Sequence, residues 1–250
     1  MLSPVTQTAI LAAVRSCEWR SMGGRPHYDY GIILHRIVAV LESGMAWRHL
    51  KMLPGPSFGT VHRHFLKWAR AGVFQSAYRS LLKLYSRKSR RGEYHCIDTT
   101  FVKSFYGRDG VGRNPTDRGR KATKVSAIVN DEGVPLSIAF FAANVSDYST
   151  VQDTLHRLIS RPVMHVPLYA DKGYDSARVR GALRDAGYLD RVGKRRTRIH
   201  RVVNARRGVV ERFFSWLDKN RRLVVRYDST ITAYEAWTWL GCCKIVARRI

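Results

Sequence analysis

The sequence is short of cysteine, and its few cysteines stand apart from any metal-binding pattern. The four are Cys17, Cys96, Cys242 and Cys243, and none belongs to a CxxC pair with histidine at zinc-ligand spacing. Short cysteine-rich chains use such patterns to build zinc knuckles or disulfide frameworks. The sequence therefore indicates neither, and it fits thiols that serve as small core residues in a reducing compartment.

Acidic residues are also scarce. Nineteen Asp and Glu stand against 44 Lys and Arg, which gives a formal net charge of +25 over 250 residues. Solubility alone seldom needs such a balance, and a polyanionic partner matches it most simply. Nucleic acid is the first candidate and an anionic membrane surface the second. The length allows one large domain or two modest ones with an ample core.

Long apolar runs are missing as well. Residues 231–247 are the most apolar stretch, but Glu235 and Lys244 interrupt them, and the stretch is short for a membrane span. Residues 1–17 contain an isolated Arg15 and no basic region before an apolar one, so they lack the pattern of a signal peptide. We therefore expect a soluble protein with no membrane partner.

The first positive signal is a pair of helical patterns near the start of the chain. In residues 29–43 apolar side chains recur at helical spacing, and Gly44 supplies a stop. After a breaker at 54–57, Ser57 can cap a second helix in "FGTVHRHFLKWARAG". The apolar stripe of this second helix comprises Val61, Phe65, Trp68 and Ala69, and its remaining surface carries His62, Arg63, Lys67 and Arg70.

The order of these elements is that of a helix-turn-helix DNA-binding unit: a helix, a short helix at "AWRHL", a turn and a basic amphipathic helix. These residues alone also fit a small helical bundle with a solvated basic face. Both interpretations make residues 1–90 an all-helical domain.

The pattern then changes to strands. Strands are predicted at 93–102, 123–131 and 134–143, with a hairpin turn at 131–133 between the last two. A helix at 149–160, a strand at 165–170, a helix at 176–186 and a short strand at 188–192 follow. Three strands in succession and then alternating helix and strand predict an α/β domain with a mixed sheet over residues 91–250.

Three acids stand where chemistry is possible. Asp98 interrupts the first strand although Asp is a poor strand former, and Asp171 ends a later strand, where open α/β sheets place ligand sites. Glu211 flanks the buried stripe of a basic helix, and Arg207 one turn earlier can pair with it. Each acid also has an ordinary structural interpretation: a hydrogen bond to a neighbouring threonine, a turn, or a surface ion pair. Asp175, before Ser176, is expected to be a helix N-cap.

Together the three acids would form an oxygen-rich site. Carboxylates are the ligands that Mg²⁺ prefers, and paired metal ions activate a water or hydroxyl and stabilise the leaving oxygen in phosphodiester displacement. If Asp98, Asp171 and Glu211 converge, a site for two Mg²⁺ ions, which Mn²⁺ could also occupy, is expected.

The motifs "CIDTT" at 96–100, "LYADKGYDS" at 168–176 and "RRGVVERFFSWLDKNRRLVVRYD" at 206–228, in this order, resemble the DDE transposases of bacterial insertion sequences, specifically the insertion-sequence-5 type. "VLESGMAWRHL" and "FGTVHRHFLKWARAGVF" resemble the DNA-binding region of the same family. The resemblance implies a ribonuclease H-like catalytic domain at 91–250, after a helical DNA-binding domain at 1–90. It also implies that Asp98, Asp171 and Glu211 are the catalytic, metal-binding triad.

A related signature of the family has Tyr, Arg, Glu and Lys at fixed spacing. Arg207 and Glu211 match it, whereas the Tyr position is Asn204 and the Lys position is Asp218, with Lys219 beside it. Forty residues separate Asp171 and Glu211, so the resemblance implies a compact core without a large inserted domain.

Two basic segments flank the proposed site. Residues 103–124 carry seven Lys or Arg with four Gly, and residues 191–207 carry eight Lys or Arg with no acid. Such segments are often only solvated, but here we expect them to neutralise phosphates. The candidate DNA contacts are His62, Arg63, Lys67, Arg113, Arg118, Arg120, Lys121, Lys172, Lys194, Arg195, Arg196, Arg198, Arg207 and Lys219.

The glycines at 107–112 do not form a phosphate-binding loop for nucleotides. Arg113 and Asn114 follow them in place of the Lys and Ser or Thr that such a loop requires, so no nucleotide partner is expected.

The function expected from the resemblance is that of a DNA transposase. It would bind terminal inverted repeats of double-stranded DNA and catalyse metal-dependent strand cleavage and transfer, as a homodimer or larger assembly on DNA. A cytoplasmic, nucleoid-associated location is expected. The alternatives are a metal-dependent endonuclease that cannot join strands and a catalytically idle DNA-binding protein.

Overall fold

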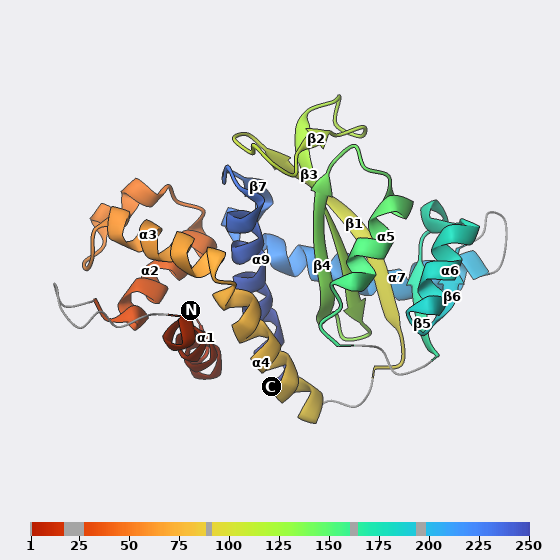
Figure 1. The fold of residues 1–250 in the computed structure, drawn as a ribbon, viewed down its shortest axis with the longest axis horizontal. Coiled ribbons are helices and arrows are strands. Elements are labelled where there is room, and N and C mark those ends of the chain that lie inside the picture. The colour runs from red at the N-terminus through yellow and green to blue at the C-terminus, as the bar shows by residue number, and fades with distance from the viewer. Residues whose placement is uncertain (1, 18–27, 89–91, 161–164, 194–198) are drawn as a thin grey trace. The chain divides into compact units, whose positions relative to one another are not determined.

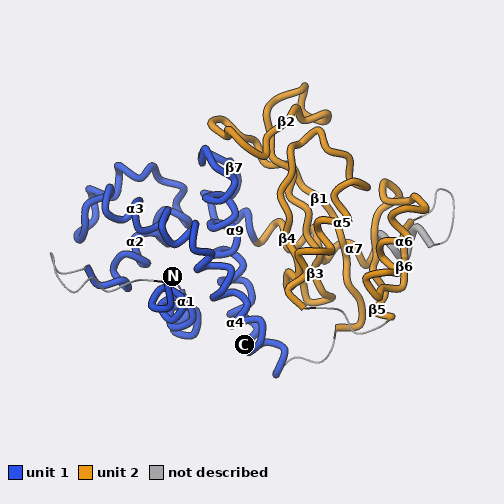
Figure 2. Tube along the Cα trace, in the orientation of Figure 1, with its two compact units in different colours: residues 1–88, 217–250 blue, residues 89–216 orange. Residues whose placement is uncertain are grey.

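The computed structural model describes residues 2–17, 28–88, 92–160, 165–193 and 199–250. Internal contacts divide the chain into two compact units, one of residues 1–88 with 217–250 and one of residues 89–216 (Figure 2). The first boundary lies close to the predicted division after residue 90. Residues 217–250, however, pack with the N-terminal helices, whereas the sequence prediction assigned them to the catalytic domain.

The first unit is built almost entirely from helices. They are α1 (Pro4–Cys17), α2 (Tyr30–Ser43), the 3₁₀ helix η1 (Trp47–Met52), α3 (Phe58–Arg70), α4 (Val73–Lys88), α8 (Arg221–Val224) and α9 (Ile231–Val246), with a two-residue strand β7 (Val225–Arg226). The sequence predicted α2, η1 and α3 individually, but α1 and α4 only as part of a helical domain.

Helix α9 explains why the C-terminal residues join this unit. It is buried nearly all round, so it needs other helices on several sides. Trp237 of α9 stacks on Phe65 of α3 with ring centroids 4.0 Å apart, and Trp239 packs on Tyr78 of α4 at 5.1 Å. The most apolar stretch of the sequence is therefore the core of a helical unit. No helix among the described residues is long and apolar enough to cross a membrane.

Local sequence signals set the ends of α2 and α3. The Asp29 side chain accepts the amide of Gly31 at 2.5 Å, and that of Ser57 accepts the amide of Thr60 at 3.2 Å. Both are N-caps, which satisfy amides that have no partner within the helix. The predicted stripe of α3 is buried, with Val61, Phe65, Trp68 and Ala69 as its members.

The connection between α2 and α3 is held by a buried arginine. Arg36, which is 2% exposed, donates to the carbonyl oxygens of Leu50 at 2.6 Å and Leu53 at 3.0 Å and to that of Pro54 at 2.5 Å. The Leu50 carbonyl also accepts the amide of Leu53 at the end of η1, and the guanidinium joins it to the carbonyls of Leu53 and Pro54. Arg36 therefore fixes the turn that precedes α3.

The second unit is a mixed sheet with helices on its faces (Figure 1). Its strands are β1 (His95–Ser104), β2 (Gly112–Arg113), β3 (Lys121–Asn130), β4 (Pro135–Ala142), β5 (Val166–Ala170) and β6 (Tyr188–Val192). Its helices are α5 (Asp147–His156), the 3₁₀ helix η2 (Lys172–Tyr174), α6 (Ala177–Asp185) and α7 (Ile199–Asp218), whose last two residues fall in the first unit.

The topology is that of a ribonuclease H-like fold. The sheet runs in the order β2, β3, β1, β5, β6, and β4 also pairs with β3. Strand β3 is antiparallel to β1 and β4, whereas β1, β5 and β6 are parallel. Nine of the ten residues of β3 are buried, because helices cover both faces of the sheet. The predicted mixed sheet and the order of its elements are confirmed.

Candidate active site

Two of the three predicted acids lie side by side on neighbouring strands. Strands β1 and β5 are parallel, and their register pairs Cys96 with Tyr169. Asp98 and Asp171 each follow two residues later, so both lie at the same level of the sheet. Asp98 is inside β1, with Ala127 of β3 as its partner, and Asp171 is the residue directly after β5. The register of the sheet therefore brings together two residues that are far apart in the sequence.

One guanidinium joins these two carboxylates. Arg207 of α7 places Nη2 2.5 Å from Oδ2 of Asp98 and Nη1 3.4 Å from Oδ1 of Asp171. The side chains of Arg207, Asp98 and Asp171 are 15%, 17% and 34% exposed. The sequence allowed Arg207 to pair with Glu211 along the helix and predicted that Arg207 contacts DNA. Its short ion pairs are instead with the two strand acids, and Glu211 contributes a weaker electrostatic attraction.

Glu211 lies one helical turn after Arg207. Its side chain is exposed. A cysteine fixes this part of α7 against β1: the thiol of Cys96 donates to the carbonyl oxygen of Arg206 at 3.4 Å. Because Cys96 is two residues before Asp98, this contact places Arg207 and the following turn next to the acid.

Burial shapes the charges of the site. Burial raises the pKa of Asp98 above its ordinary value, and the positive charge and hydrogen bond of Arg207 oppose this effect. For Arg207 itself burial acts to lower the pKa, but the attraction of Asp98, Asp171 and Glu211 exceeds it, and the pKa is raised. Burial also raises the pKa of the Cys96 thiol to about 12. Cys96 is therefore a neutral packing group here, and Arg207 and the two acids paired with it carry the charges next to it.

The donor chemistry of the acids fits a divalent cation. Carboxylate oxygens are the ligands that hard cations such as Mg²⁺ take, and a cationic group already lies between Asp98 and Asp171. Within the described parts of the chain, no three His, Cys, Asp or Glu side chains are grouped closely enough to hold a metal ion. Two of the acids are thus together, and Glu211 is on the adjoining helix.

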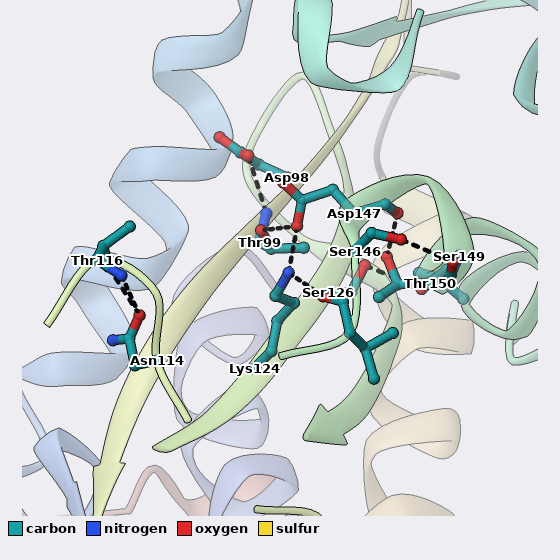
Figure 3. A network of polar contacts seen from close by, with 12 residues as sticks. Asp98, Thr99, Asn114, Thr116, Lys124, Ser126, Ser146, Asp147, Ser149 and Thr150 are labelled. Atoms are coloured by element: carbon teal, nitrogen blue, oxygen red, sulfur yellow. Dashed lines mark hydrogen bonds and ion pairs between the residues drawn. The ribbon is translucent and has the colours of Figure 1, made fainter. Parts of the chain in front are cut away.

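A second polar network supports Asp98 and was not predicted from the sequence (Figure 3). Thr99, the residue after Asp98, donates its hydroxyl to Oδ1 of Asp147 at 3.1 Å, and the ammonium of Lys124 lies 2.7 Å from the same oxygen. Lys124 also donates to the carbonyl of Val145. The signal was present in "TKVSAIVN", because a lysine in a buried strand needs a partner.

The stretch "LYADKGYDS" divides differently from the prediction. Ser176 is the N-cap of α6, and its hydroxyl accepts the amide of Val179 at 3.2 Å. Asp175, the predicted cap, instead pairs with Arg180 at 2.8 Å. Asp171 itself caps η2 by accepting the amide of Lys172 at 2.7 Å. Asp171, the proposed site residue, therefore also forms the turn into η2.

Most of the candidate DNA contacts that the structure describes are exposed. They are Arg63, Lys67, Arg113, Arg118, Arg120, Lys121, Lys172 and Lys219. His62 is half-buried and packs on Trp47 with ring centroids 4.8 Å apart. Burial lowers the pKa of His62, which favours the neutral imidazole that packs on Trp47. Lys194, Arg195, Arg196 and Arg198 lie outside the described residues.

Comparison with known proteins gives the family. Residues 92–244 match the transposase DDE domain. The chain is 36% identical over 150 residues to the Burkholderia cepacia protein named "Putative transposase for insertion sequence element IS402", a match that covers 56% of this chain and 70% of that protein.

Solved structures show only a distant likeness. A Mos1 strand transfer complex is 14% identical with a TM-score of 0.37, and the match covers 93% of this chain and 79% of that chain. A pre-cleavage Mos1 transpososome is 13% identical with a TM-score of 0.36, covering 93% and 80%. The family and the sequence identity together show that this chain belongs to the DDE transposases of insertion sequences, which are nuclease and transesterase enzymes that use divalent metal ions.

Proposed function

We propose that this transposase binds the terminal inverted repeats of its element and uses Asp98, Asp171 and Glu211 as the triad that cleaves and transfers DNA strands. The observation that supports this assignment most directly is the pairing of Asp98 and Asp171 with one arginine from α7. Two strands and one helix thereby direct their charged groups to a single place in the fold. In this proposal Glu211, one turn further along α7, supplies the third carboxylate.

The cofactor we propose is a pair of Mg²⁺ ions, for which Mn²⁺ can substitute. When bound, such ions activate the attacking oxygen and stabilise the leaving one. The carboxylates of Asp98, Asp171 and Glu211 would hold them, and Thr99 would keep Asp98 in position through its amide, which donates to Oδ1 of Asp98 at 2.9 Å. Water is the first nucleophile, and the freed 3′-hydroxyl then attacks target DNA by in-line displacement.

The DNA surface we propose has two parts. The first is α3, with Arg63 and Lys67 exposed on a helix whose other face is buried. The second is the connection between β1 and β3, which carries Arg113, Arg118 and Arg120 on its surface. Exposed cations of this kind bind DNA phosphates and release counterions, which makes the affinity depend on salt.

The proposal extends to assembly and place of action. Two element ends have to be brought together for transfer, so we expect a homodimer or larger assembly on double-stranded DNA. A cytoplasmic, nucleoid-associated location and membership of the insertion-sequence-5 type belong to the same proposal.

A joining assay tests this function. The protein is incubated with Mg²⁺, a labelled duplex that carries the element's end, and a target plasmid. We expect the label to appear in the plasmid. Cleavage without joined product would favour an endonuclease, and binding without cleavage would favour an idle DNA-binding protein.

A further inference from the structure

Arg207 pairs with two of the acids that we propose as metal ligands. Its two terminal nitrogens lie 2.5 Å from Oδ2 of Asp98 and 3.4 Å from Oδ1 of Asp171, so it bridges the two acids as a cation would. A divalent ion bound to the same oxygens would lie within a few ångströms of the guanidinium. Like charges at that separation, in a half-buried site, repel strongly. Arg207 and a metal ion therefore compete for these oxygens.

Other contacts leave the carboxylates little freedom to avoid this competition. Oδ1 of Asp98 accepts the amide of Thr99 at 2.9 Å, and Oδ1 of Asp171 accepts the amide of Lys172 at 2.7 Å. Both acids are thus held by the backbone of the chain, and the contact of Cys96 with the carbonyl of Arg206 holds α7 near them. The group that can move is the long side chain of Arg207.

The guanidinium also has an unused donor. Nε of Arg207 is buried and has no hydrogen-bond partner among the described residues, while both terminal nitrogens face carboxylates. A buried donor without a partner is costly, so the present arrangement does not satisfy Arg207 fully. A phosphate can accept two parallel N–H groups from one guanidinium, Nε–H among them. The two separate acids accept only from the terminal nitrogens.

We infer that Arg207 is a built-in counterion of the Asp98–Asp171 pair. Bound metal displaces Arg207, which then binds a DNA phosphate, so that metal and DNA promote each other's binding. This inference rests on the proposed function, because it assumes that Asp98 and Asp171 are metal ligands. It changes the predicted role of Arg207 from a permanent DNA contact to a group that exchanges partners. Mutual promotion follows from linkage: if DNA raises the affinity for metal, metal raises the affinity for DNA by the same factor.

The test is the affinity of the free protein for Mn²⁺, measured by calorimetry without DNA. Arg207→Gln removes the competing charge, and we expect it to bind Mn²⁺ at least tenfold more tightly than the natural chain. The matched control is Arg212→Gln, which removes an equal charge from the same helix beside Glu211. Arg212 is exposed and lies over the Trp216 ring at 5.8 Å, so its loss should change the affinity less than twofold.

Three results have different meanings. Tighter binding by Arg207→Gln alone supports the exchange. Equal affinities for Arg207→Gln and the natural chain would overturn the inference and leave the triad in place. If none of the proteins binds Mn²⁺ at millimolar concentration, the proposed metal site itself fails.

A second measurement does not require the Gln variant to fold. In the natural chain Ca²⁺, an oxygen-seeking cation, should increase the affinity for an end-containing duplex severalfold in fluorescence anisotropy. Arg207→Lys keeps the charge but has one nitrogen in place of a fork, so it should lose most of this gain. If Ca²⁺ increases the affinity of the Lys variant as much as that of the natural chain, the exchange is contradicted.

Discussion

Removal of Lys124 and removal of Asp147 should lower the free energy of unfolding by different amounts, although the two form one ion pair. The Lys124 side chain is 5% exposed and that of Asp147 is 39% exposed, with 2.7 Å between Nζ and Oδ1. Removing the acid leaves an ammonium buried in the sheet, whereas removing the lysine leaves a carboxylate that water can reach. Asp147→Ala should therefore destabilise the fold more than Lys124→Met.

The size of the difference follows from the exposure of each partner. At 2.7 Å and an effective dielectric constant of about 20, the attraction is roughly 6 kcal/mol before the cost of dehydrating the ammonium, which is several kcal/mol. Stranding a buried charge costs about 3–5 kcal/mol. Losing an ion pair whose remaining acid is hydrated costs about 1 kcal/mol. The double variant Lys124→Met, Asp147→Ala should cost far less than Asp147→Ala alone.

Urea unfolding of the four proteins, followed by circular dichroism, gives these free energies and their coupling. Asp153→Ala is the control, because Asp153 is an exposed acid on the same helix, α5, and its loss should change stability by less than about 0.5 kcal/mol. Equal costs for Asp147→Ala and Lys124→Met, or a double variant as unstable as the sum of the two, would refute the reasoning.

Three further predictions concern other contacts. Arg36→Met removes the guanidinium that donates to three carbonyl oxygens before α3 and should lower the free energy of unfolding by about 2–4 kcal/mol; an unchanged urea midpoint would contradict this. Ser57→Ala removes the cap of α3 and should lower the free energy of unfolding by about 1 kcal/mol in the same assay. Ser57→Asp can still cap the helix and should retain most of that stability. Burial lowers the pKa of His95 to about 4, so the folded state rejects a proton that the unfolded chain binds below pH ~6.5. Stability should therefore fall by roughly 3 kcal/mol as the pH falls from 6.5 to 4. His95→Gln should lose this dependence, and an identical pH profile in the two proteins would count against the assignment.

Local patterns predicted those parts of the fold that local physics decides. The buried stripe of α3 and its Ser57 cap follow from helical spacing and from the unsatisfied amides of a first turn. The order of strands and helices after residue 91 likewise predicted the mixed sheet. The sequence could not show that α9 packs with the first unit, because an apolar helix can complete any core that lies within reach of the chain.

The sequence identified two acids that the structure brings together, but it did not show their contacts. Asp98 and Asp171 were identified by their positions at strands, and the parallel register of β1 and β5 brings them together. The spacing of four allowed Arg207 to pair with Glu211, but such a spacing describes an isolated helix. In the folded chain, the half-buried acids of two strands bind the guanidinium more strongly than an exposed neighbour on the same helix does. Asp175 failed as a cap because Ser176, one residue later, takes that position.

Mg²⁺-dependent cleavage of a duplex that carries the element's end tests the central claim most directly. The proteins to compare are the natural chain and the variants Asp98→Asn, Asp171→Asn and Glu211→Gln, with duplex binding measured in parallel by gel shift. These substitutions keep the size of each side chain and remove its negative charge, so we expect cleavage to be abolished while binding is largely retained. Full cleavage by any one variant would remove that residue from the triad and contradict the account.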